Sequence, residues 1–592
     1  MNQYRTLLPF LKPYRQGIFW GMLLVVLASA FTLAGPWLIG RGIDLMEVPG
    51  TTLRQILGVA GLLVLVALLG GAARYGQREL LNSISRRVEI DLRDALFEHM
   101  LRLDAAFFGR HPTGDLMSRA TNDTQAARQA IGPGVMYAVN TLVTTLMTLP
   151  VMYDVSPQLT LIALVPMVLL PPAMLWFGRE IHRRYAKIQE HFGVISTLAQ
   201  ENLAGARIVR AYGQEHAQER EFAELNRVYL GKNMDLARVE GIFRPLLGAI
   251  AGGGMVIVVW FGGVQVMEGQ MSIGDFVAFG MYLSMMIWPM IALGWVVNLF
   301  QRGAASLGRI NTIFLTQPRV QQAADPARPA RIRGEIEFDD VRFTYPGTDR
   351  EVLAGVSFHV QAGQTVALVG PTGSGKSTIV QLLARAYDPT AGEIRIDGIP
   401  LPQLDLATLR RSIRMAPQDA FLFSETIAEN IALGWTGDGA ATESIEEAIQ
   451  IAQLTETVAE LPKRLETRLG ERGINLSGGQ RQRATLARAI VGDPAILILD
   501  DTLSAVDTRT ERAILAGLRR VLADRTAFII SHRVTAVMNA DVILVLDEGR
   551  IVERGTHAEL IRDEGLYARL LRRQLLEEDL ESDSVAAGST TV

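Results

Sequence analysis

The chain has 592 residues, of which 49% are hydrophobic and 20% are charged, and its formal net charge is −4. This length exceeds what a single hydrophobic core organises, so we expect at least two domains. The slightly acidic balance gives no reason to expect a nucleic-acid partner. The chain contains no cysteine, which excludes disulfides, thiol catalysis and cysteine-ligated metals.

Residues 1–315 form a predicted all-α transmembrane domain. Residues 4–14 mix leucines with basic residues, which is typical of a helix that lies along a membrane interface. Six nearly charge-free runs follow, each with the roughly 20 residues that cross a bilayer as a helix: 17–40, 56–73, 131–153, 157–178, 245–267 and 276–300. A buried soluble helix would explain any one run, but six of them indicate an integral membrane protein.

Arginine placement predicts the topology. The connections after the second and fourth runs are long and rich in arginine, whereas residues 154–158 and 268–275 contain neither lysine nor arginine. The positive-inside rule therefore puts both termini and both long loops in the cytoplasm. The long loops have a helical pattern, so we expect the second to fifth spans to continue far beyond the membrane. The turns near His111 and Gly213 are either contact points for another domain or ordinary solvated turns.

Residues 316–333 lack hydrophobic periodicity and are interpreted as a linker. Alternating strand and helix patterns over residues 334–573 predict a layered α/β domain. Residues 574–592 are acidic and then rich in Ser, Thr and Gly, a composition typical of a disordered tail.

A glycine-rich loop follows the apolar run 365–369 and precedes a helical pattern, which is the setting of a nucleotide P-loop. Glycines let the backbone wrap phosphates, and the helix N-terminus favours an anion. The lysine is expected to reach the β and γ phosphates, and the first serine after it to bind Mg²⁺. The alternative is a turn that only connects strand to helix. The candidate binding residues are Gly370, Thr372, Gly373, Ser374, Gly375, Lys376, Ser377 and Thr378.

Further candidates follow other predicted strands or begin helices. Asp500 ends the apolar strand 495–499 and is the expected second Mg²⁺ ligand. A second helix N-terminus with small residues is expected where Ser477, Gly478, Gly479 and Gln480 precede a helical run. The other candidates are Gln418, a third possible metal ligand; Tyr345, which stacks on a purine or is merely structural; His532, a γ-phosphate sensor; and Asp501 and Asp507.

These motifs together resemble a half-transporter of the ABC exporter superfamily, of the type IV, multidrug-exporter kind. The run Leu476 to Gln480 resembles the signature of ABC ATPases, and residues 470–473 and 201–212 resemble exporter elements. The resemblance extends to about residue 573. It implies ATP with Mg²⁺ as cofactors, Tyr345 as the adenine-stacking residue, Gln418 as the Q-loop, Asp507 as part of the D-loop and His532 as the switch histidine. It also makes the turns near His111 and Gly213 coupling helices.

One position departs from the family pattern. The residue after the Mg²⁺ aspartate is usually the glutamate that orients the attacking water, but here it is Asp501. A carboxylate one methylene shorter sits roughly 1 to 1.5 Å farther away, which can cost about 100-fold in rate. Because each ATP site in the family combines the P-loop of one chain with the signature of the other, we expect a heterodimer whose partner has the glutamate. The alternative is a homodimer with two slow sites, which the intact His532 favours.

The expected function is ATP-driven export by alternating access, with the catalytic roles on Asp501, His532 and Gln418. A gated channel or regulatory subunit is the alternative. Since no span has an ionised residue at its centre, we expect hydrophobic or amphipathic cargo such as drugs, lipids or peptides. Met281, Met285, Met286 and Met290 follow helical spacing and either line a cargo site or pack against lipid and helices. The expected partners are a second half-transporter chain and membrane lipid, and the expected location is a bacterial plasma membrane.

Overall fold

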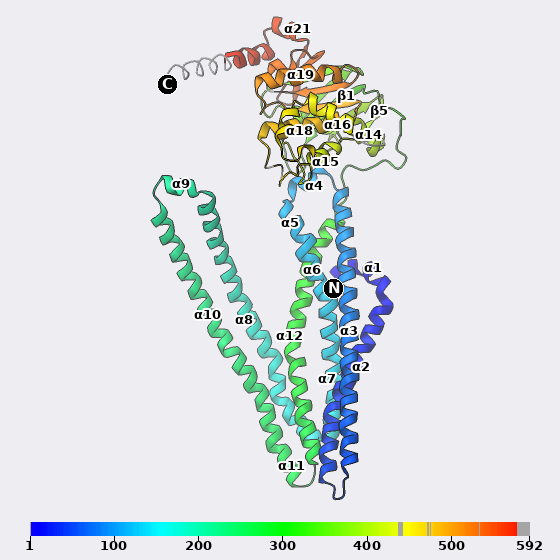
Figure 1. Ribbon diagram of the computed structural model, residues 1–592, viewed down its shortest axis with the longest axis vertical. Helices are drawn as coiled ribbons and strands as arrows, with labels where there is room; N and C mark the ends of the chain where they lie inside the picture. Colours follow the sequence, from blue (N-terminus) through cyan, green and yellow to red (C-terminus); the bar gives the residue numbers. More distant parts are fainter. Residues whose placement is uncertain (1, 436–441, 471–472, 474, 532, 577–592) are drawn as a thin grey trace. The chain divides into compact units, whose positions relative to one another are not determined.

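The structure is a computed structural model, and it describes residues 2–435, 442–470, 473, 475–531 and 533–576 (Figure 1). The chain divides into two compact units. The first consists of Met1–Leu101 and Thr113–Thr316, and the second of Arg102–Pro112 and Gln317–Val592. The tail that the sequence predicts to be disordered lies, from residue 577 on, outside the described residues.

The first unit is entirely helical (Figure 1). Its long helices are α2 (Arg15–Glu47), α3 (Leu53–Arg102), α7 (Val135–Val155), α8 (Pro157–Ala204), α10 (Glu215–Ile257) and α12 (Ile273–Leu315). Shorter segments extend or join them: η1 (Asn2–Leu7), α1 (Leu8–Leu11), η2 (Lys12–Tyr14), α5 (Thr113–Ser118), η3 (Arg119–Asp123), α6 (Thr124–Gln129), η4 (Ala130–Gly134), α9 (Ala206–Ala211), η5 (Val258–Gly262) and α11 (Gly263–Met267).

Among the described residues, six continuous helical stretches of 43 to 53 residues are long and apolar enough to span a membrane. A helix of 43 residues is about 65 Å long, roughly twice the hydrocarbon core of a bilayer. The prediction of six spans is therefore confirmed, as is the prediction that the second to fifth continue as helices. The parts of these helices outside the apolar runs have charged residues, which form ion pairs such as the one between Arg128 and Glu89, with 3.0 Å between nitrogen and oxygen.

Helix α12 is the centre of the first unit. Its side chains pack against α2, α7 and α8, and many of them are buried, including Phe279, Tyr282, Leu283 and Met286. Helices α8 and α10 form a pair along their length and meet α12 near α11, as Figure 1 shows. At this end Leu159 and Met167 of α8 are fully buried in the same apolar cluster as the α12 residues. The pair is thus attached by apolar packing at one end of the bundle.

The second unit has two sheets. A four-stranded sheet has the order β2-β1-β4-β5, and a six-stranded sheet has the order β10-β9-β3-β8-β7-β6, parallel except for β10. The strands are β1 (Ile336–Thr344), β2 (Glu351–Val360), β3 (Thr365–Val369), β4 (Ala391–Ile396), β5 (Ile399–Pro400), β6 (Ile413–Ala416), β7 (Ile496–Asp500), β8 (Thr526–Ile530), β9 (Val542–Asp547) and β10 (Arg550–Gly555).

The helices of the second unit are α4 (Ala105–Arg110), α13 (Lys376–Leu383), η6 (Leu401–Gln403), α14 (Leu406–Ser412), α15 (Ile427–Ala432), α16 (Thr442–Ile451), α17 (Thr455–Glu460), η7 (Arg464–Glu466), α18 (Gly478–Ile490), α19 (Thr508–Leu522), α20 (Val534–Val537) and α21 (His557–Arg562). The fold class predicted from the sequence, six apolar helices followed by an α/β domain, is confirmed. Because β3, β7 and β6 are parallel, the loops after all three strands leave the same edge of the sheet.

Two segments outside the predicted α/β domain belong to the second unit. The segment before β1 packs on it: Ile332 is buried in its core, and the Ala327 amide donates to the Gln403 carbonyl at 2.8 Å. The short helix α4 joins this unit through Asp104, whose carboxylate accepts from the Arg319 amide at 2.5 Å. The segment with α4 and His111 thus belongs to the second unit, whereas α9 belongs to the helical unit, where Ile208 and the following Tyr212 are exposed.

Candidate nucleotide-binding site

The loop between β3 and α13 uses a backbone that favours glycine. Gly373 and Gly375 have φ angles of 81° and 102°, in the left-handed region that L side chains rarely adopt. A Cβ on Gly375 would also lie 2.7 Å from Leu353 Cδ2. The loop therefore curls tightly and directs the N-terminus of α13 toward the space above the sheet edge, where helix amides favour an anion.

Lys376, the first residue of α13, folds back over this loop. Its ammonium donates to the Gly370 carbonyl at 2.9 Å and to the Pro371 carbonyl at 2.8 Å. The side chain is only 6% exposed, and burial lowers its pKa, an effect that the nearby Asp500 and Asp501 carboxylates oppose. A buried cation held at the mouth of the loop is well placed to interact with phosphate oxygens.

The carboxylates come from the end of β7. Asp500 is buried, and its Oδ1 accepts a hydrogen bond from Ser377 Oγ at 3.1 Å. Asp501 follows in a left-handed backbone conformation with φ of 48°, and its amide donates to the Ile530 carbonyl at 2.9 Å. Asp500 and Asp501 border one cavity.

Tyr345 flanks the far side of α13. Its hydroxyl is hydrogen-bonded to Thr378 Oγ1 at 3.0 Å and donates to Gln381 Oε1 at 3.1 Å. Its ring packs edge-on against Phe343 and Tyr387, with centroid separations of 4.8 Å and 5.4 Å. The ring orientation is therefore fixed from three directions, and the ring borders the same cavity as the loop.

These side chains enclose a cavity of about 360 Å³. It brings together ten of the residues predicted from the sequence: Tyr345, Thr372, Gly373, Gly375, Lys376, Ser377, Thr378, Gln418, Asp500 and Asp501. Gly370 and Ser374 shape the loop from behind and do not line it. Arg350, the residue before β2, also lines the cavity and was missed, because no motif surrounds it in the sequence.

The predicted second helix N-terminus does not line this cavity. Ser477 caps α18 in a capping box with Gln480: the Gln480 amide donates to Ser477 Oγ, and the Ser477 amide donates to Gln480 Oε1 at 2.8 Å. Gly479 packs on the segment after β7, since a Cβ there would lie 2.7 Å from the Ala505 carbonyl. The helix start is thus locked to residues 504–506 of the same chain.

Asp507 ends that segment and caps α19. Its carboxylate accepts from the Thr510 amide at 3.0 Å, and hydrogen bonds from this backbone amide and the Thr510 side chain lower its pKa. It does not line the cavity either. His532, the predicted γ-phosphate sensor, lies outside the described residues.

The combination defines a class of protein. A glycine loop, a helix N-terminus, a buried lysine and a hydroxyl–carboxylate pair form an anion-binding pocket of the size of a nucleotide site. The same chain has six helices that can cross a membrane. The chain is therefore an integral membrane protein with its own nucleotide-binding domain.

Comparison with known proteins identifies the family. Residues 18–290 match the ABC transporter transmembrane region, and residues 353–504 match the ABC transporter domain. The chain belongs to the ABC transporter family and is a half-transporter of the exporter type. It binds ATP, and as a member of this family it couples ATP hydrolysis to transport.

Individual relatives span nearly the whole chain. The probable multidrug resistance ABC transporter ATP-binding/permease protein YheI of Bacillus subtilis is 38% identical over 96% of this chain and 97% of its own. The ATP-dependent lipid A-core flippase of Photobacterium profundum is 36% identical over 86% of this chain and 87% of its own. The structure of a bacterial Atm1-family ABC exporter with ATP bound aligns with a TM-score of 0.77 at 30% identity, covering 95% of this chain and 99% of that one.

Proposed function

We propose that the chain exports hydrophobic or amphipathic molecules by ATP-driven alternating access, as one half of a heterodimer in which its own catalytic carboxylate is weakened. The observation that carries this proposal is Asp501, which lines the nucleotide cavity beside Lys376 and Asp500 in the position where the family has glutamate. In this mechanism ATP binding closes the paired nucleotide domains, and hydrolysis resets them.

The cargo class rests on the composition of the spans and on the relatives. The spans have no ionised residue at their centres, so they offer no charge for a polar cargo to pair with. The relatives include a probable multidrug resistance transporter and a lipid A-core flippase, so their names indicate drugs and a lipid as cargo. Drugs, lipids and apolar peptides all fit this description.

The site residues fit a bound Mg²⁺ ion. Ser377 Oγ and Asp500 Oδ1 are hard oxygen ligands that lie 3.1 Å apart, and the Gln418 amide lines the same cavity. When bound there, Mg²⁺ would neutralise the charge on the β and γ phosphates.

The chain's own residues have distinct roles in this proposal. Lys376 and the loop amides hold the phosphates, and the Tyr345 ring stacks on the adenine. Asp501 orients the attacking water, but its short side chain leaves the carboxylate about 1 Å too far away, which slows hydrolysis about 100-fold. His532 senses the γ-phosphate, while Gln418 and Asp507 transmit occupancy between the domains.

The signature residues favour a dimer. Ser477, Gly478 and Gly479 lie outside this chain's own nucleotide cavity, so in the proposed dimer they complete the site of the second chain. An undamaged signature beside a shortened carboxylate favours a partner that supplies the glutamate. A homodimer with two slow sites is the alternative. In either case the location is a bacterial plasma membrane with both termini in the cytoplasm, as the arginine distribution and the bacterial relatives favour.

Steady-state ATPase of the purified chain alone, with Mg²⁺ and in detergent, tests this proposal. The native chain is expected to be nearly inactive, and Asp501→Glu is expected to raise turnover at least tenfold, about 1.4 kcal/mol of barrier. Asp547→Glu, which lengthens the carboxylate at the end of strand β9 of the same sheet, is the matched control and should change nothing. Fast turnover of the native chain without gain from glutamate would instead establish a homodimeric exporter.

Transport itself separates an exporter from a gated channel or regulatory subunit. Inverted membrane vesicles that contain the active complex should accumulate a hydrophobic dye against its gradient when ATP is added. A channel only equilibrates the dye, so a plateau at equal concentrations would contradict export.

A further inference from the structure

A chain of hydrogen bonds connects the turn that contains Asp501 to helix α18. Ser504 Oγ donates to the Asp501 carbonyl oxygen at 2.9 Å. The same hydroxyl accepts from Gln482 Nε2 of α18 at 3.0 Å. A side chain of α18 therefore reaches, through one hydroxyl group, the backbone of a carboxylate residue that lines the nucleotide cavity.

The side-chain amide of Gln482 has a fixed orientation. The Ala505 amide donates to Gln482 Oε1 at 3.0 Å. Because a backbone N–H can only donate, this contact identifies the oxygen and leaves Nε2 to face Ser504. The Ser504 hydroxyl has a single proton, and since its oxygen accepts from Nε2, that proton is available to the Asp501 carbonyl. The chain of bonds thus runs in one direction, from Gln482 through Ser504 to Asp501, and each bond polarises the next.

Helix α18 and the segment after β7 hold each other in place around this chain of bonds. The Gln482 side chain is only 8% exposed, and both polar ends of its amide are hydrogen-bonded to residues 504–505. Breaking either bond leaves a buried polar group without a partner, which is costly. Arg533 fixes the end of the same segment, because its guanidinium donates to the Val506 carbonyl at 3.1 Å. The segment therefore has little freedom to shift relative to α18.

The backbone of Asp501 needs such support. Its φ of 48° lies in the left-handed region, which residues other than glycine seldom adopt. Its amide is held by the Ile530 carbonyl at 2.9 Å, and its carbonyl is held by Ser504. An aspartate has only two side-chain torsions, so the backbone conformation largely decides where the carboxylate lies. A misplacement of about 1 Å can cost roughly 100-fold in rate.

We propose that Gln482 and Ser504 are positioning residues for ATP hydrolysis, which hold the turn of residue 501 so that its carboxylate meets the attacking water. The inference rests on the proposed function in one respect, namely that Asp501 orients this water. It makes the position of the carboxylate depend on α18 as well as on β7. Neither side chain touches the nucleotide cavity, so both act through Asp501.

Hydrogen–deuterium exchange of the full-length native chain without nucleotide tests the support of the turn. Ser504→Ala removes the hydroxyl at an exposed position, and we expect the Asp501 amide to exchange at least fivefold faster. Ser504→Thr retains the hydroxyl and should stay within twofold of the native rate. The Leu499 amide, in the same strand β7, should not change in either variant. Unchanged exchange at Asp501 in Ser504→Ala would overturn the proposal.

Gln482→Glu tests the first bond of the chain at constant side-chain size. It keeps an acceptor for the Ala505 amide but replaces the donor to Ser504 by a second acceptor. The hydroxyl proton then binds the new carboxylate and leaves the Asp501 carbonyl, so exchange at Asp501 should again rise at least fivefold. Gln450→Glu makes the same chemical change at an exposed position of α16 and should have no effect. If the buried charge of Gln482→Glu prevents folding, the Ser504 pair still decides the outcome.

Steady-state ATPase in the Asp501→Glu background tests the consequence for hydrolysis. Ser504→Ala and Gln482→Glu should each lower kcat about tenfold and leave both KM for ATP and the thermal midpoint nearly unchanged, because the turn acts on the attacking water and not on nucleotide binding. Ser504→Thr should retain the parent kcat. The two losses should not multiply, since either substitution breaks the same chain of bonds.

Two kinetic results would contradict the positioning role. One is a loss in KM that equals the loss in kcat, which indicates a general structural effect. The other is a double variant about 100-fold slower than its parent, which indicates two independent contributions. If no variant hydrolyses ATP, the proposed function fails. The exchange rates, which need neither ATP nor a partner chain, then still show whether Gln482 and Ser504 hold the turn of Asp501.

Discussion

The hydroxyl of Ser377 donates a hydrogen bond to Asp500 Oδ1 across 3.1 Å, which links the start of α13 to the end of β7. The two residues are 123 positions apart in the chain. They meet because β3 and β7 are both parallel strands on either side of β8, so that their carboxyl ends share one edge of the sheet. The pair is the part of the site that a cation would use.

Replacing Asp500 by asparagine should separate nucleotide binding from hydrolysis. The amide keeps the size of the side chain but removes the negative charge, so we expect Mg²⁺-dependent ATPase of an Asp501→Glu background to fall about 100-fold. Binding of a fluorescent ATP analogue without Mg²⁺ should remain within threefold. Asp547→Asn, at the end of β9 and outside the cavity, is the control. Equal losses in both variants would show that the effect is structural.

Tyr345 offers a test of ring stacking against simple packing. Tyr345→Phe keeps the ring and loses only the hydrogen bonds to Thr378 and Gln381, so ATP affinity should change less than threefold. Tyr345→Ala removes a stacking contact worth about 1 kcal/mol and should weaken ATP binding about tenfold or less, as measured by calorimetry. Tyr387→Ala removes the ring that packs against Tyr345 without lining the cavity. If Tyr387→Ala weakens ATP binding as much as Tyr345→Ala does, Tyr345 has only a packing role.

Two aspartates that cap helices should make the nucleotide domain sensitive to acid. Asp405 and Asp507 accept hydrogen bonds from the amides of Thr408 and Thr510, which lower both pKa values below the ordinary 3.8. A lowered carboxylate pKa stabilises the fold above the unfolded pKa, and this stabilisation is lost as the pH falls through the folded value. Below about pH 4, the midpoint of thermal unfolding should therefore drop more steeply with falling pH than it would if both carboxylates kept their ordinary pKa values in the folded protein.

A double variant can keep both helix caps while it removes the negative charges of the two aspartates. Asparagine also caps helices well, so Asp405→Asn with Asp507→Asn should keep the midpoint near pH 7 and flatten its decline in acid. Glu221→Gln, at an exposed position of α10, controls for the loss of a carboxylate. Parallel pH profiles for the native protein and the double variant would contradict the assignment.

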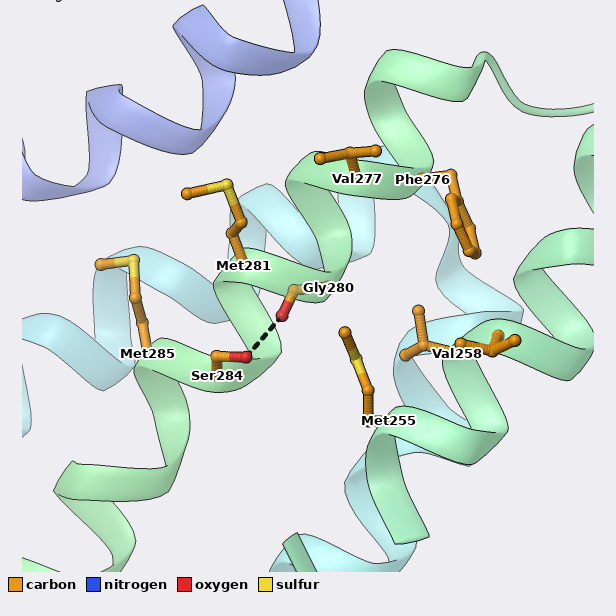
Figure 2. A pocket seen from close by; sticks show the side chains of 9 residues that line it. Met255, Val258, Phe276, Val277, Gly280, Met281, Ser284 and Met285 are labelled. Atoms are coloured by element: carbon orange, nitrogen blue, oxygen red, sulfur yellow. Dashed lines mark hydrogen bonds between the residues drawn. The ribbon is translucent and has the colours of Figure 1, made fainter. Parts of the chain in front are cut away.

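Much of the fold can be predicted from sequence patterns that do not depend on contacts between distant segments. The length of the apolar runs predicts membrane helices because the bilayer fixes their length, and the P-loop spacing predicts its strand–turn–helix setting because phosphate binding requires that geometry. The same reasoning could not distinguish Met285 from Met286. Both residues fit a helical face. Only the packing of α10 against α12 places Met285 at the pocket between these two helices (Figure 2) and buries Met286.

Other features depend on contacts between distant segments. Arg350 lines the nucleotide cavity only because β2 begins beside the P-loop, and no local motif indicates this. The segment before β1 has no periodicity, yet Ile332 is buried in a core cluster formed by strands that follow it in the chain. The π-helical turn η5 is equally invisible in the sequence, since its residues are ordinary membrane-helix residues.

Helices α2 and α12 approach each other closely at the start of α12. Asp44 of α2 accepts hydrogen bonds from the Gly274 amide at 2.7 Å and from Ser272 Oγ at 2.9 Å, so that it satisfies the start of α12 from a neighbouring helix. The helices meet through Gly40 and Gly274. A Cβ on Gly274 would lie 2.1 Å from the Gly40 carbonyl oxygen and 2.5 Å from the Asp44 carboxylate. No side chain fits there without separation of the helices.

Gly274→Ala should therefore destabilise the helical unit although alanine favours helices. The backbone carbonyl of Gly40 cannot move aside as a flexible side chain would, so the substitution should cost the two hydrogen bonds to Asp44, roughly 1 to 3 kcal/mol each. Gly35→Ala, in the same α2 helix with nothing within 4 Å of the added Cβ, should be neutral or stabilising by about 0.5 kcal/mol. Thermal unfolding of both variants in one detergent compares them. An unchanged midpoint for Gly274→Ala would mean that α2 and α12 are not in contact at this position, whereas a loss reproduced by Asp44→Ala would identify the shared helix contact as the cause.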